Sequence, residues 1–74
     1  MALDGGADGL DFYRRISREA GSYLLIGGSL LFEVGIGQAA DVAALMQAAG
    51  FTDIALLRDL GGIDRVVHGK WNTR

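Results

Sequence analysis

The clearest chemical pattern in this chain is the stretch Gly-Ile-Gly-Gln-Ala-Ala at residues 35–40. It spells G-x-G-x-x-A, follows a short apolar run typical of a strand, and opens a segment with helical periodicity. A glycine-rich turn in that setting brings backbone N–H groups close to the phosphates of a dinucleotide. Asp59, near the end of the next predicted strand, is placed to bind ribose hydroxyls. The motif is short and glycine is abundant, so a purely structural strand-to-helix turn is the competing interpretation.

The remaining reactive side chains are few. The chain has no cysteine and one histidine, His68, which excludes a disulfide framework, a thiolate metal site and a histidine metal cluster. His68 has no predicted cysteine, histidine or serine partner for nucleophilic catalysis. We therefore predict no catalytic residue and no metal ligand within these residues.

Composition narrows the class of protein further. The chain has 74 residues, half of them apolar, and a net charge of −2, which indicates one small globular domain. A mildly acidic chain lacks the basic surface expected for nucleic acid or an anionic membrane. No apolar run approaches the roughly 20 residues that span a bilayer. The acidic, glycine-rich start is unlike a signal peptide, so we expect a soluble, cytoplasmic protein.

Periodicity predicts the elements that position these residues. Apolar spacings of three and four predict helices over residues 10–24 and 38–49. Asp8 and Asp11 are candidates to cap the first helix, and Gly50 is expected to end the second with a positive φ. Apolar runs bounded by turn signals predict strands over residues 29–35, 52–57 and 65–71, the last two joined by a glycine turn. The order is helix, strand, helix, strand, strand.

Five motifs in this order give the chain a family resemblance. They are ALDGGADGLDFYRRI at residues 2–16, GGSLLFEVG at 27–35, Gln38, AALMQAAGFTDI at 43–54, and RDLGGIDRVVHGK at 58–70. The whole chain resembles the C-terminal part of the HemK/PrmC family, the S-adenosylmethionine-dependent protein-(glutamine-N5) methyltransferases. It departs from the family pattern at Leu25-Ile26, usually Lys-Pro, and at Gly37 and Ile63. The Gly37 departure creates the G-x-G appearance by accident.

The resemblance implies an α/β fold, the C-terminal portion of a Rossmann-like class I methyltransferase domain. Residues 1–74 would then be a single partial domain. The family's final strand runs antiparallel between the two preceding strands, so we expect a three-stranded mixed sheet. Successive right-handed crossovers moving in one direction should place both helices on one face.

The resemblance also implies a function, methylation of the glutamine in the Gly-Gly-Gln motif of peptide chain release factors. In the family the cofactor loop and the Asn-Pro-Pro-Tyr motif lie upstream of this region. The chain has no proline and cannot contain that motif. We therefore expect the isolated chain to be inactive and to bind no S-adenosylmethionine. Two alternatives stay open, a nucleotide-binding βαβ unit using residues 35–40 and a non-catalytic structural or interaction module.

Some positions match motifs that the resemblance places near the substrate. The loop before the first helix corresponds to a substrate-side loop, which makes Gly5, Gly6, Asp8 and Gly9 candidates, with a helix-capping loop as the competing interpretation. Glu33 matches a strand glutamate that either supports the cleft wall or faces solvent. The predicted partner is a release factor, with no membrane and no direct nucleic acid. Uncovered strand edges and faces predict a homodimer or higher oligomer.

Overall fold

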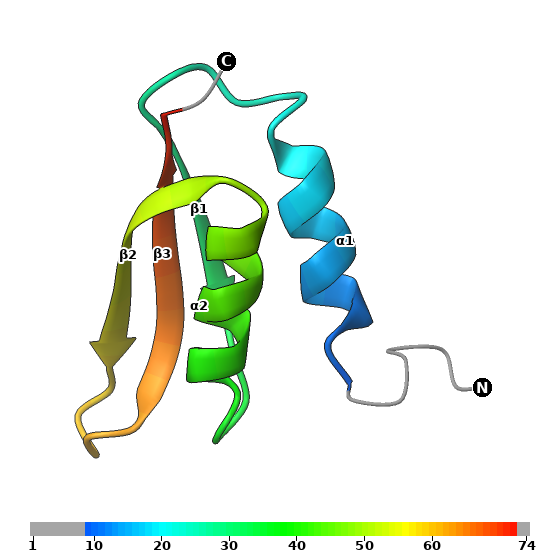
Figure 1. Cartoon of the computed structure of the whole chain (residues 1–74). Coiled ribbons are helices and arrows are strands. Elements are labelled where there is room, and N and C mark those ends of the chain that lie inside the picture. The colour runs from blue at the N-terminus through cyan, green and yellow to red at the C-terminus, as the bar shows by residue number, and fades with distance from the viewer. Residues whose placement is uncertain (1–8, 73–74) are drawn as a thin grey trace.

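The structure is a computed structural model that describes residues 9–72. It has the predicted order of elements (Figure 1): α1 (Asp11–Ala20), β1 (Gly28–Glu33), α2 (Ala39–Ala48), β2 (Phe51–Arg58) and β3 (Asp64–Trp71). None of the helices within residues 9–72 has the length and apolarity needed to cross a bilayer.

The three strands form one sheet with β3 in the centre, in the order β1-β3-β2. β1 pairs with β3 in antiparallel register from Gly28 opposite Trp71 to Glu33 opposite Val66. β2 also pairs with β3 in antiparallel orientation. The predicted order and strand directions are confirmed, and β1 and β2 run the same way on either side of β3. "Mixed" does not describe these three strands, because both pairings are antiparallel.

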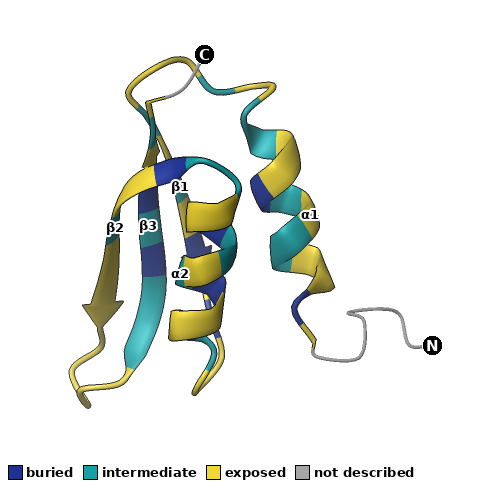
Figure 2. Ribbon diagram, in the orientation of Figure 1, coloured by how far each residue is buried: buried dark blue, intermediate teal, exposed yellow. Residues whose placement is uncertain are grey.

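Both helices lie on one face of this sheet, as predicted (Figures 1 and 2). Val42 and Met46 on α2 are fully buried against Phe51 of β2 and Val67 of β3. α1 lies beside α2 and contributes partly buried apolar side chains to the same core. Within residues 9–72 no helix covers the opposite face, so this part of the chain forms two layers with its core between them.

α1 is shorter than predicted at both ends. It ends at Ala20, with Gly21 as its C-cap, rather than continuing to residue 24. A Cβ on Gly21 would lie 2.6 Å from the ring of Trp71, so glycine is required by this close contact with the last strand. At the other end the N-cap is Leu10, without a side-chain capping bond. Asp11 lies inside the helix and pairs with Arg14, and Asp8 lies outside the described residues.

α2 begins and ends one residue inside its predicted range, and Gly50 follows its C-cap. Gly50 has a φ of 109°, which confirms the predicted positive φ at this helix end. The helix comes close to the sheet because Gly69 in β3 has no side chain. A Cβ there would lie 2.9 Å from both Met46 Cε and Ile54 Cδ1.

Candidate functional site: the carboxyl end of strand β1

The carboxyl ends of β1 and β2 lie at the same edge of the sheet because the two strands run in the same direction. In α/β sheets, ligands bind beyond the carboxyl ends of such strands. Beside the end of β1 lie Glu33, the turn into α2 and Gly9, which precedes the N-cap of α1. These segments are distant in sequence, and two polar side chains connect them.

Tyr13 on α1 is the first of these side chains. Its ring packs edge-to-face against Phe32 of β1, with centroids 5.0 Å apart and planes at 86°. Phe12 makes edge contacts with both rings, at 5.5 Å to Tyr13 and 6.3 Å to Phe32. Such aromatic contacts restrict the ring orientation. The Tyr13 hydroxyl is thereby held near the end of β1, where it donates to the Glu33 carbonyl oxygen at 3.3 Å.

Gln38 provides the second polar side chain that connects these segments. Its Oε1 accepts a hydrogen bond from the Gly35 N–H at 2.8 Å, and the Gln38 N–H donates to the Gly35 carbonyl at 3.1 Å. The Tyr13 hydroxyl lies 3.4 Å from the same Oε1. A Cβ on Gly35 would lie 3.0 Å from Oε1, so any larger residue there would press on the Gln38 side chain where it folds back over the turn. The G-x-x-Q spacing therefore closes the turn between β1 and α2.

This closed turn does not fit a nucleotide cofactor. The Gly35 N–H, which a phosphate-binding turn would direct at a ligand, is already bonded to Gln38. The Asp59 carboxylate is also occupied: Oδ1 accepts from the N–H groups of Gly61 and Ile63, and Oδ2 accepts from Arg65. These bonds, with that from Ile63 as the largest cause, lower the pKa of Asp59 from its usual 3.8. The geometry supports the structural interpretation of residues 35–40.

The sequence-predicted site residues are only partly brought together. Gly9 has a φ of 71°, and a Cβ there would lie 4.0 Å from Gln38 Nε2, which places Gly9 beside the turn. Gly5, Gly6 and Asp8 lie outside the described residues. Glu33 contributes its backbone carbonyl to the Tyr13 contact, while its side chain is exposed and makes no ion pair among the described residues. In this chain Glu33 therefore faces solvent.

Sequence reasoning missed the roles of Tyr13 and Gln38. Tyr13 was predicted only to lie within the first helix, over residues 10–24, and Gln38 only to start the second helix and to match the family pattern. A glutamine three residues after a glycine, at a strand-to-helix turn, is a signal that would have suggested the side-chain bond. His68 lies in the middle of β3, opposite Leu31 and Ala55, and residues 9–72 contain no metal-binding cluster.

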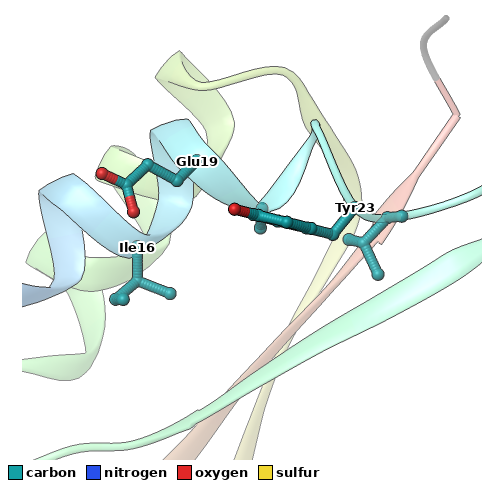
Figure 3. A pocket seen from close by; sticks show the side chains of 5 residues that line it. Ile16, Glu19 and Tyr23 are labelled. Carbon is teal, nitrogen blue, oxygen red and sulfur yellow. The ribbon is translucent and has the colours of Figure 1, made fainter.

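A hollow of about 210 Å³ lies along the inner face of α1 (Figure 3). One of its lining residues, Leu24, lies next to the start of β1, because its Cδ2 is 3.2 Å from the position that a Cβ on Gly28 would take. The hollow is mostly apolar and is lined by Ile16, Glu19, Ala20, Tyr23 and Leu24.

No family model matches the chain, but comparison with individual proteins gives a consistent result. It is 54% identical over 69 residues to a release factor glutamine methyltransferase of Geobacter sulfurreducens, and 47% identical over 70 residues to one of Pseudomonas aeruginosa. These matches cover 93% and 95% of the chain. Over nearly its whole length, the chain is similar to members of this family of methyltransferases. The predicted resemblance is confirmed.

A solved structure supports the same assignment. The crystal structure of a release-factor-specific protein-(glutamine-N5) methyltransferase from Alicyclobacillus acidocaldarius matches 99% of the chain at 34% identity, with a TM-score of 0.71. The α/β fold of a methyltransferase domain is thereby confirmed. The chain spans only 24% of the Geobacter relative, 25% of the Pseudomonas relative and 45% of the solved chain.

Proposed function

We propose that the chain works as one part of a release factor glutamine methyltransferase. In this proposal the methyl group comes from S-adenosylmethionine and is transferred to the glutamine side-chain nitrogen of the release factor's Gly-Gly-Gln motif. The observation that carries the proposal is the family match over nearly the whole chain. The chain supplies a sheet segment and its carboxyl edge, and the reacting groups come from the rest of the enzyme.

The outer edge of β1 supports the proposal that the chain is one part of a larger enzyme. The Val34 N–H donates to the Arg65 carbonyl of β3, so alternation along the strand turns the backbone groups of residues 29, 31 and 33 away from β3. Of these, the Glu33 carbonyl accepts from the Tyr13 hydroxyl. Unpaired strand edges accept a further strand. Beside this edge lies the apolar hollow under α1, which side chains from an added strand would fill (Figure 3). We propose that residues 1–74 are a partial domain completed along this edge.

We further propose that residues 1–74 alone neither bind S-adenosylmethionine nor transfer a methyl group. The closed turn at residues 35–40 and the occupied Asp59 carboxylate support this proposal. Isothermal titration of the chain with S-adenosylmethionine and with NAD should give no binding heat. Binding of either compound would favour the alternative nucleotide-binding unit.

A chimeric enzyme tests the function directly. In the Geobacter sulfurreducens relative, the 69 matched residues are replaced by the corresponding residues of this chain. We expect the chimera to methylate a release factor and to leave a variant with Gly-Gly-Ala in place of Gly-Gly-Gln unmodified, as measured by mass spectrometry. The unmodified relative is the positive control. A folded chimera without methylation would contradict the proposal.

A further inference from the structure

The turn between β2 and β3 lies at the same end of the sheet as the candidate site. β2 runs in the same direction as β1 and ends at Arg58, so this turn follows the carboxyl end of its strand, as the turn into α2 follows that of β1 (Figure 1). Arg65 of β3 connects the two places. Its carbonyl oxygen accepts from the Val34 N–H at 2.8 Å, and its Nε donates to Asp59 in the turn at 3.2 Å. The position of the turn is therefore fixed relative to the end of β1.

Hydrogen bonds hold the backbone of this turn, residues 59–63, in one shape. The Asp59 carboxylate accepts from the N–H groups of Gly61 at 2.8 Å and Ile63 at 3.1 Å. The Asp59 N–H donates to the Ile63 carbonyl at 2.9 Å, and the Gly62 N–H donates to the Asp59 carbonyl at 3.0 Å. A partner that binds the turn therefore does not have to order it first, which lowers the entropic cost of binding.

The tip of the turn is apolar and uncharged. Leu60 lies there with its side chain fully exposed. The charged residues at the base of the turn pair with one another, Arg58 with Asp64 and Arg65 with Asp59. What this turn presents to a partner is therefore a leucine side chain rather than a charge.

A second large apolar side chain is exposed at the same end of the sheet. Ile36 is 71% exposed in the turn between β1 and α2, which the bond between Gly35 and Gln38 closes. Because β3 separates β1 from β2, the turns that carry Ile36 and Leu60 lie on either side of the central strand. Small ligands bind in concave pockets, whereas apolar side chains that project from two separate turns suit contact with a protein surface.

We propose that Leu60 is a docking residue for the release factor. Its side chain, held at the tip of the preformed β2–β3 turn, enters an apolar pocket on the release factor, and Ile36 provides a second contact at the same edge. This inference rests on the proposed function and names residues with which this edge binds the protein substrate. Both side chains act on binding of the release factor, and neither takes part in methyl transfer.

Kinetics of the chimeric enzyme test the docking role. Leu60→Ala should raise the KM for the release factor about tenfold, because it removes most of a buried apolar side chain from the complex. Leu60→Asp should raise it further, since a carboxylate would enter an apolar pocket. The KM for S-adenosylmethionine and kcat should stay unchanged. Leu25→Asp is the matched control, because Leu25 is 84% exposed in the loop before β1, at the opposite end of the sheet. It should match the parent chimera.

Two further measurements define the kind of contact. The ratio of release factor KM values between Leu60→Ala and the parent chimera should be the same at low and high salt, because an apolar contact is not screened. The melting temperatures of the 74-residue chain and of the chimera should be unchanged by Leu60→Ala, since the side chain contacts the release factor and not the enzyme itself.

The outcomes separate this inference from the proposed function. An active parent chimera whose release factor KM is unaffected by Leu60→Asp would overturn the docking role alone. So would equal changes in both KM values or a lower melting temperature of the Leu60→Ala chimera, which would show that Leu60 packs within the enzyme. A loss that disappears at high salt would overturn the apolar contact. An inactive parent chimera would overturn the proposed function and, with it, the docking role.

Discussion

At the scale of single residues, Gly50 shows how one backbone angle ends a helix. Its φ of 109° lies in a region that side chains with a Cβ rarely adopt. We expect Gly50→Val to lower the free energy of unfolding by more than about 1 kcal/mol. Ala48→Val, at an exposed position of the same helix, measures the cost of a β-branched residue without the φ penalty. Equal urea midpoints for the two variants would show that the positive φ at position 50 adds no cost for a residue with a Cβ.

Ser17 is a buried residue, 1% exposed, whose hydroxyl lacks a hydrogen-bond partner among the described residues. A buried hydroxyl without a partner costs free energy, and alanine is also the better helix former. We expect Ser17→Ala to raise the free energy of unfolding by about 1 kcal/mol. Exposed Ser22 provides the control, since Ser22→Ala should change little in the same urea titration.

At the scale of elements, the turn between β2 and β3 is organised by Asp59. Its carboxylate accepts from two backbone N–H groups of the turn and from Arg65, and these bonds lower its pKa. A group with a lowered folded-state pKa stabilises the fold when ionised, above its unfolded pKa near 3.8. That contribution is lost as pH falls through the lower, folded-state pKa.

We therefore expect Asp59→Ala to be less stable than the parent chain at pH 7 and to approach it in stability as the pH falls below about 4. Asp59→Asn keeps one acceptor oxygen without the charge. It should be intermediate at pH 7 and should lack this part of the pH dependence. Thermal unfolding followed by circular dichroism across pH 2.5–7 provides the measurement. A stability difference between Asp59→Ala and the parent that does not change with pH would exclude an ionic role for Asp59.

Most elements could be predicted from the sequence because each carries a local signal. Periodicity located α2 to within a residue at each end, and the apolar runs located all three strands. The end of α1 was predicted too late, at residue 24 instead of Ala20, and the close contact of the Trp71 ring with Gly21 next to that end joins residues far apart in the sequence. The site was harder still. The Gly35–Gln38 bond has a local signal, but the bonds from Tyr13 to Glu33 and to Gln38 join residues 20 and 25 positions apart, and no local pattern contains that information.

At the scale of the whole molecule, the sheet face without helices is an uncovered surface with exposed apolar residues. Alternation places Leu31 of β1 and Leu57 of β2 on this face, opposite the buried Phe32. Their side chains are 57% and 49% exposed. The outer edge of β1 is also open, but α1 stands beside it (Figure 1), and Tyr13 already bonds the outward Glu33 carbonyl. Pairing two β1 edges in one continuous sheet would place both copies of α1 on the same side of the junction, where they would collide.

We therefore expect two copies of the isolated chain to associate by stacking these uncovered faces about a two-fold axis. Burying about 300 Å² of apolar surface contributes about 7 kcal/mol before the costs of association are counted. Analytical ultracentrifugation at micromolar concentration should show a dimer. Leu57→Lys lies on the face but away from the β1 edge, so it should give a monomer. Leu60→Lys, at the fully exposed tip of the β2–β3 turn, should leave the dimer intact. A dimer that survives Leu57→Lys would point to the β1 edge instead, and a folded parent chain that is strictly monomeric would refute self-association altogether.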